Sequence, residues 1–106
     1  MFYIKQNDTS PAIQATLKDV DGAVVPLAGA TVRFHMRKQG STTAKVDAAA
    51  TIVDDVGGIV RYNWVAADTN TVGTYQAEFE VTYSDNTVET FPNASYLKVK
   101  VIDDIA

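Results

Sequence analysis

The sequence predicts an all-β protein that folds as an antiparallel sandwich of two sheets with seven or eight strands. Apolar and polar residues alternate with a period of two along several segments, as in strands with one buried face and one wet face. Turn-forming residues separate these segments, and no stretch of about 10 to 12 residues shows the 3.6-residue period of a helix. Short strands without crossover helices are typical of a two-sheet sandwich.

Five segments alternate clearly and three alternate weakly. The clear strands are expected over residues 13–17, 32–36, 60–64, 75–83 and 97–101. Weaker strands are expected over residues 2–6, where the chain opens with an edge strand, and over residues 44–53 and 87–91. β-Branched and aromatic residues support the last of these. The run Ala48-Ala49-Ala50 in the 44–53 segment also tolerates a helical turn.

The breaks between these strands contain residues that favour tight reversals. Glycines at positions 22, 40 and 57–58 adopt a positive φ at little cost. Asp85-Asn86 closes the 75–83 strand into the next strand, because Asn and Asp tolerate the left-handed region. The turns therefore agree with the strand boundaries.

Size and composition exclude several classes of protein. A chain of 106 residues, 46% of them hydrophobic, builds one core but not two, so we expect a single domain over residues 1–106. The absence of cysteine excludes a disulfide scaffold, a thiolate zinc site and a cysteine nucleophile. No run approaches the ~18 apolar residues of a membrane span. We expect no membrane partner and no cofactor.

The charge is negative and unevenly spread. Residues 1–53 contain six Lys or Arg and four Asp, whereas residues 54–106 contain three Lys or Arg and nine Asp or Glu, for a net charge of −4. An acidic domain is poorly suited to grip a phosphate backbone. Nucleic acid is therefore not an expected partner.

The turn before the longest alternating strand is more specific. Asp68, Gly73 and Tyr75 lie in a segment that resembles the tyrosine corner of immunoglobulin-like sandwiches. In that corner a glycine precedes a tyrosine whose hydroxyl bonds back to the upstream backbone. The resemblance implies an immunoglobulin-like arrangement of the sandwich.

A cationic stripe is one candidate interaction surface. Arg33, His35 and Arg37 alternate with apolar residues and share the polar face of their strand, while Glu78 and Glu80 share that of the 75–83 strand. If the two stripes lie on opposite sides of the sandwich, neighbouring copies can stack electrostatically. The alternative is that they are solvated faces or form cross-strand pairs within one copy.

The opening segment is a second candidate. Phe2, Tyr3 and Ile4 place two aromatic rings beside the N-terminus, as expected of a swapped or docking strand. The alternative is that Phe2 and Ile4 complete the core of their own domain.

No catalytic or metal-binding constellation is evident. His35 lies between two arginines, whereas a catalytic histidine needs an acidic orienting group and a nucleophile. Paired aspartates at positions 19 and 21, 54 and 55, and 103 and 104 offer oxygen ligands that suit calcium, but the later ligands of a complete loop motif are missing. Their alternative role is to cap turns. We expect neither a catalytic residue nor a metal site, and no enzyme.

Several stretches match a known family in order along the chain. They are VPLAGATVRFHM (25–36), GIVRYNW (58–64), Asp68-Thr69, GTYQAEF (73–79) and Phe91-Pro92. Together they resemble the immunoglobulin-like N-terminal domain of phage upper baseplate proteins. The sequence departs from that family at Pro26, where a polar residue is usual, and at Asp85-Asn86, which replaces a common Asp-Gly.

The resemblance implies a non-enzymatic structural protein of the virion, in the tail, the baseplate or the head surface. Family members often continue into a linker and a receptor-binding or fibre region, whereas this sequence ends at Ala106. We therefore expect a stand-alone adaptor, decoration or fibre-anchoring module. Its expected partners are other virion structural proteins, in a homo-oligomer or multi-copy assembly, and its expected location is the virion, assembled in the host cytoplasm.

The alternative function is a carbohydrate-binding or host-adhesion module. In that role Tyr3, Tyr96 or another exposed aromatic side chain serves as a platform for a sugar, and the partner is a host surface glycan. Aromatic residues that lie in the core count against this alternative.

Overall fold

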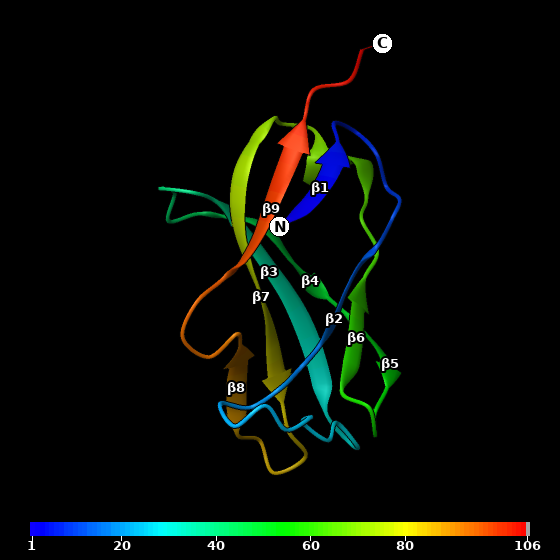
Figure 1. Ribbon diagram of the computed structural model, residues 1–106, viewed down its shortest axis with the longest axis vertical. Coiled ribbons are helices and arrows are strands. Elements are labelled where there is room, and N and C mark those ends of the chain that lie inside the picture. The colour runs from blue at the N-terminus through cyan, green and yellow to red at the C-terminus, as the bar shows by residue number, and fades with distance from the viewer. Residues whose placement is uncertain (106) are drawn as a thin grey trace.

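The computed structural model describes residues 1–105, which form two β-sheets packed face to face as an immunoglobulin-like sandwich (Figure 1). This confirms the predicted fold class. The strands are β1 (Phe2–Lys5), β2 (Ile13–Thr16), β3 (Thr31–Lys38), β4 (Ala44–Ala49), β5 (Thr51–Asp54), β6 (Ile59–Tyr62), β7 (Gly73–Thr82), β8 (Val88–Phe91) and β9 (Leu97–Ile102). One short 3₁₀-helix, η1 (Ala66–Thr69), precedes β7. No helix within these residues is long and apolar enough to cross a membrane.

The larger sheet has six strands in the order β1-β9-β7-β3-β4, with β8 paired to the end of β7, and the smaller sheet has the order β2-β6-β5. Strand β7 is long enough to take two partners in succession. Its first half pairs with β9 and its second half with β8. The chain therefore leaves the sheet after β8 and returns as β9, and this excursion shapes the outer face of the sheet.

The first strand departs from the predicted antiparallel arrangement. β1 pairs in parallel with β9, with Phe2 opposite Val99 and Ile4 opposite Val101. Between these two parallel strands the chain crosses to the smaller sheet and returns (Figure 1). β1 is an edge strand, as expected, but the sandwich is mixed rather than wholly antiparallel.

The segment predicted as a single strand over residues 44–53 is two strands, which raises the count to nine. β4 belongs to the larger sheet and β5 to the smaller one. Between them, Ala50 donates its backbone N–H to the carbonyl of Val32 at 2.8 Å. The three alanines of this segment carry small side chains that set no strong in-out alternation. The chain therefore changes sheets there, and no helical turn forms.

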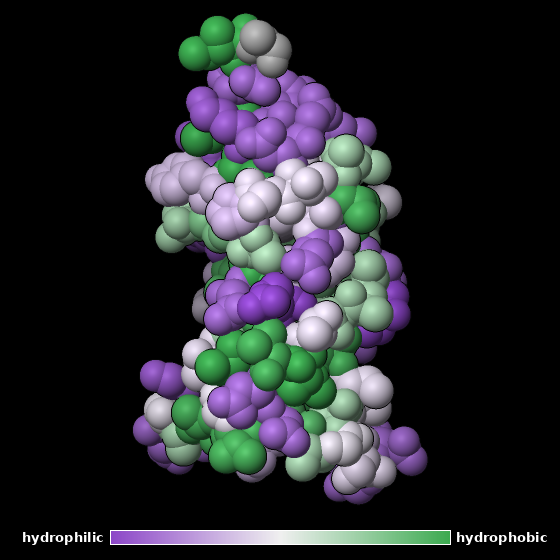
Figure 2. All heavy atoms as spheres, turned by 90° about the vertical axis from the view of Figure 1, so that its right-hand side faces the viewer, coloured by the Kyte–Doolittle hydropathy of each residue, from purple (hydrophilic) through white to green (hydrophobic). Residues whose placement is uncertain are grey.

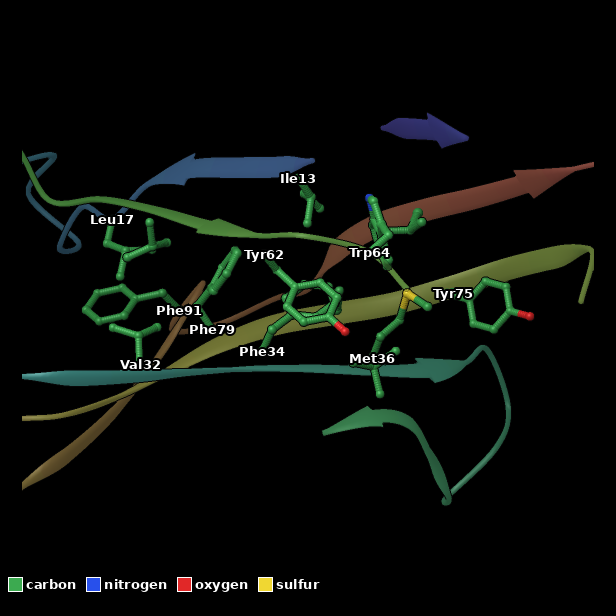
Figure 3. Close-up of a cluster of buried hydrophobic side chains, with 14 of the residues drawn as sticks. Ile13, Leu17, Val32, Phe34, Met36, Tyr62, Trp64, Tyr75, Phe79 and Phe91 are labelled. Carbon is green, nitrogen blue, oxygen red and sulfur yellow. The ribbon is translucent and has the colours of Figure 1, made fainter. Parts of the chain in front are cut away.

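Aromatic rings fill the middle of the sandwich (Figure 3). Phe34 on β3 is fully buried and stacks on Tyr62 of β6, with ring centroids 4.6 Å apart. Trp64 and Phe79 lie against the same ring at 5.5 Å and 5.1 Å. Trp64 was predicted to lie on a strand, but β6 ends at Tyr62. Its side chain nevertheless continues the inward alternation and is buried.

Asn86 and Gly58 are two of the turn positions that have a left-handed backbone. Asn86 adopts φ of 70°, as expected for the turn between β7 and β8. Gly58 adopts φ of 65°, and a Cβ atom there would lie 2.7 Å from a methyl carbon of Val24 and 2.8 Å from the carbonyl oxygen of Val25. Only glycine fits this position, because both the conformation and the space exclude a side chain.

We expect the protein to lose stability in alkaline solution because of Tyr83, which lies just beyond β7. Burial, and next the hydrogen bond that its hydroxyl donates to Glu89 at 2.7 Å, raise the pKa of Tyr83 to about 12. The folded protein therefore keeps a proton that the unfolded chain loses near pH 10, its ordinary value. The resulting stabilisation is complete below about pH 10 and is lost as the pH rises through about 12.

The measurement is urea unfolding of the native protein and of Tyr83→Phe at about pH 9 and about pH 11. The variant should lose less stability between the two pH values than the native protein does. An equal loss in both proteins would contradict this role of Tyr83.

Candidate functional site

The tyrosine-corner residues lie where η1 leads into β7. Tyr75 is buried, and its hydroxyl donates a hydrogen bond of 2.6 Å to the carbonyl oxygen of Thr71, four residues upstream. Burial raises the pKa of Tyr75. Gly73 lies beside Lys38, whose Cε would be 3.1 Å from a Cβ atom at that position. The hydrogen bond ties the η1 connection to the start of the longest strand.

Replacing Tyr75 with Phe should remove this hydrogen bond and leave the packing of the ring intact. The carbonyl of Thr71 then loses a partner, and we expect a loss of about 1 kcal/mol in the free energy of unfolding. Urea unfolding of Tyr75→Phe beside Tyr3→Phe, a variant at an exposed tyrosine, measures this difference. Equal stability of the two variants would show that the hydrogen bond contributes nothing.

Asp68 has a different partner from Tyr75. Its Oδ2 atom accepts hydrogen bonds from the hydroxyl of Tyr62 at 2.6 Å and from the backbone N–H of Val65 at 3.0 Å. Burial, and next the bond to Asp68, raise the pKa of Tyr62 above its usual range. This link joins η1 to β6. Sequence reasoning placed Asp68 at the corner but missed Tyr62, because the phenol belongs to the alternating core pattern and gives no separate signal.

Replacing Asp68 with Ala should destabilise the fold by about 2 kcal/mol, because a charge-assisted hydrogen bond is lost and a buried hydroxyl remains without an acceptor. The double variant Asp68→Ala/Tyr62→Phe removes both partners. It should cost less than the sum of the two single variants when their unfolding free energies are compared. Strict additivity would contradict a direct interaction.

The opening residues divide between the core and the surface. Ile4 is buried, and the ring of Phe2 lies 5.9 Å from that of Trp64, so both pack inside the sandwich. Tyr3 points outward and is 56% exposed. Of the three candidate residues in this segment, Tyr3 alone has a side chain that a partner can contact without disturbing the core.

The cationic stripe lies on the outer face of the larger sheet, and so do the glutamates. Arg33 is opposite Glu80 and His35 is opposite Glu78 in the pairing of β3 with β7. The two stripes therefore share one face and do not lie on opposite sides of the sandwich. This geometry removes the condition on which electrostatic stacking of copies through these stripes depended.

Each cation of the stripe has a partner within the chain. Arg33 donates two hydrogen bonds to Oδ1 of Asp47, at 2.9 Å and 3.0 Å. His35 lies between two carboxylates, with Nε2 3.2 Å from Asp47 and Nδ1 3.3 Å from Glu78. Hydrogen bonding from Arg33 lowers the pKa of Asp47. Sequence reasoning missed Asp47, because its place opposite His35 follows from the register of β4 and not from spacing along the chain.

Arg37, the third residue of the cationic stripe, contacts an aromatic ring. Its Nε donates to Oε1 of Gln76 at 3.0 Å, and one terminal nitrogen donates to the hydroxyl of Tyr96 at 3.3 Å. The guanidinium carbon lies 5.2 Å from the centre of the Tyr96 ring, a cation–π contact. Tyr96 remains 44% exposed.

Two hollows on the outer face of the larger sheet meet at Tyr96 and Glu78. One has a volume of about 300 Å³ and is lined mainly by polar side chains of β3, β4 and β7, among them Asp47 and Gln76. The other, of about 350 Å³, lies against β8 and the connection to β9. We call the two together the Tyr96 groove. Neither Tyr3 nor Arg33 lines it.

One aspartate of each of the first two pairs bonds to its own turn. Oδ1 of Asp19 accepts the backbone N–H groups of Asp21 and Ala23, and Oδ1 of Asp54 accepts that of Gly57. Between residues 1 and 105 the structure brings together no group of three acidic or histidine side chains that could hold a metal ion. The bonds are those of turn-capping aspartates.

Comparison with known proteins yields one family. The family model of the BppU N-terminal domain matches residues 2–104, nearly the whole chain. No curated protein matches the chain significantly. The matched residues include all the strands of the sandwich, the buried aromatic core and the corner at Tyr75. The chain therefore belongs to the BppU N-terminal domain family, whose members are structural domains of phage baseplate upper proteins.

Proposed function

We propose that the protein is a non-enzymatic structural part of the virion, a rigid adaptor, decoration or fibre-anchoring module that acts as one domain in a multi-copy assembly. The observation that carries this proposal is the family match over residues 2–104. A sandwich with a continuous aromatic core suits the role, because a part that positions other subunits must hold its shape.

A docking surface for a neighbouring virion protein is available at one end of the smaller sheet. Val20 and Val56 are 86% and 83% exposed, and Val24 and Val53 are each more than one-third exposed. All four lie on β5 or on the turns that precede β3 and β6. Figure 2 views this side of the molecule and shows a hydrophobic patch in its lower half. Exposed apolar patches mark contact surfaces in soluble proteins.

Aspartates surround these valines. Asp19 and Asp21 flank Val20, and Asp54 and Asp55 flank Val56 on one side. An apolar centre with an acidic rim fits a partner surface that has an apolar centre and basic rim residues. The Lys or Arg residues of the partner then set the register of the contact.

The experiment is complementation of a phage that lacks this gene with plasmid-encoded variants. Mass spectrometry and immunogold labelling of purified particles should find the native protein at the baseplate. Val56→Lys should be incorporated at least about tenfold less, because it buries an unpaired charge in the contact. Val88→Lys, at an exposed valine on β8, should be incorporated normally. Particles without the native protein would overturn the structural role, and normal incorporation of Val56→Lys would overturn this surface.

The second candidate function is that of a carbohydrate-binding or host-adhesion module. One observation favours it: Tyr96, an exposed tyrosine, lines two adjoining polar hollows. Tyr3, which is also exposed, lines neither of them.

A further inference from the structure

The Tyr96 groove is formed by the path of the chain between β8 and β9. Strand β8 pairs with the second half of β7, residues 92–96 then leave the sheet, and the chain returns as β9 to pair with the first half of β7. The hairpin between β3 and β4 projects on the same side of the molecule (Figure 1), and its Thr42 lines the same hollow as Tyr96. The groove therefore lies on the outer face of the larger sheet, between the β3–β4 hairpin and the β8–β9 connection.

The side chains in the groove have planar polar ends and unused bonding capacity. Arg37 has five N–H groups, and the contacts with Gln76 and Tyr96 use two of them. Within residues 1–105, the contact with His35 uses only Oε2 of Glu78, and the amide of Asn93 donates to neighbours while its carbonyl oxygen has no intrachain partner. Planar groups of this kind present paired donors and acceptors to adjacent hydroxyls.

These side chains are also held in place before any ligand arrives. Arg37 is fixed by Gln76 and Tyr96, and Glu78 by His35. Binding of a ligand then has no entropy cost for ordering these side chains. The guanidinium of Arg37 lies over one face of the Tyr96 ring, and the other face offers an apolar surface against which the C–H face of a sugar ring packs.

Size and charge narrow the class of ligand. Each hollow lies near the lower end of the range of roughly 300–1,000 Å³ for small-ligand pockets. Together they suit a ligand of two linked rings better than one large molecule. The carboxylates of Glu78 and Asp47 face the same space as Arg37. They repel a negatively charged ligand, so we expect a neutral one.

We propose that the Tyr96 groove is a two-subsite binding site for a neutral oligosaccharide, with Tyr96 at the point where the two subsites meet. The inference rests on the second candidate function and supplies its site and its ligand class. It is independent of the valine surface, which lies on the turns of the smaller sheet.

The test is titration of the full ¹⁵N-labelled chain with maltose, cellobiose, lactose and N,N′-diacetylchitobiose at millimolar concentration, followed by amide chemical shifts. At least one sugar should shift the amides of residues 35–37, 76–78 and 93–96. Tyr96→Ala should weaken binding about tenfold, whereas Tyr96→Phe, which keeps the ring, should retain most of it. Tyr3→Ala is the matched control at an exposed tyrosine outside the groove and should bind as the native protein does. An unchanged spectrum outside the groove shows that each variant is folded.

Three results would overturn the proposal, and they separate the site from the function. If no sugar shifts any amide, both the site and the carbohydrate-binding function fail. If a sugar binds but Tyr96→Ala binds it equally well, or Tyr3→Ala abolishes binding, the function stands and the site is wrong. If sialyllactose binds as tightly as lactose, the assignment of a neutral ligand is wrong.

Discussion

Phe34→Ala should destabilise the protein by about 4 kcal/mol, the largest effect that we expect from a single truncation in the core. Phe34 is fully buried, and its ring contacts Tyr62, Trp64 and Phe79. Removing the ring leaves a cavity at the point where the two sheets meet, and the surrounding rings are too rigid to fill it. Since a domain of this size is stable by about 5 to 15 kcal/mol, the loss is a large part of the total.

Urea unfolding measures the loss, and Tyr3→Ala is the matched control because it removes an aromatic ring from the surface of the same sheet. The control should change the stability by about 0.5 kcal/mol or less. The intensity of Trp64 fluorescence should also change in Phe34→Ala, since the two rings are in edge contact. A loss below about 1 kcal/mol would mean that the core does not depend on this ring.

Gly58→Ala should cost about 3 kcal/mol, through backbone strain and a steric clash rather than through the removal of a side chain. At φ of 65° an L-residue is strained, and the new Cβ would lie 2.8 Å from the carbonyl oxygen of Val25 and 3.2 Å from that of Leu17. The backbone must shift, and the shift disturbs the hydrogen bond that Leu17 N–H donates to the carbonyl of Gly58 at 2.8 Å.

Gly22→Ala separates the two parts of this cost. Gly22 also has a positive φ, of 82°, but nothing lies within 4 Å of a Cβ atom there. It should lose only the conformational part, about 1 kcal/mol. The difference between the two variants in urea unfolding is then the steric part. Equal losses would show that the chain around Gly58 yields without cost.

The strands were predictable because a half-buried strand must alternate with a period of two. The long β7 shows this most clearly, with Tyr75, Ala77, Phe79 and Val81 all buried. The turn at Asn86, where φ is positive, was predictable because Asn and Asp tolerate the left-handed region. Local chemistry determines these features, so a single sequence reveals them.

Features that depend on which strands become neighbours were not predictable. The alternation of β1 is the same whether it pairs in parallel or antiparallel, so the sequence could not reveal its parallel pairing with β9. The change of sheets at Ala50 falls in a run of alanines that carries no alternation. The position of Asp47 beside His35, and of Glu78 on the same face, follows from strand order and register.

The candidate site was predictable only in its parts. Arg37 and Tyr96 were both singled out from the sequence, one for a charged stripe and the other as a platform for a sugar. Their contact across 59 positions arises from the excursion between β8 and β9. A side chain in a connection without periodicity gives no indication of the strand that it will cover.

The change of sheets at Ala50 has a mechanical consequence. β4 and β5 are consecutive strands joined by one residue, so along that edge the two layers are covalently continuous. A force that separates the layers must extend this joint and break the hydrogen bond from Ala50 to Val32. We expect this joint to resist shear between the two layers along that edge. Such a joint suits a component that transmits load between its neighbours without deforming.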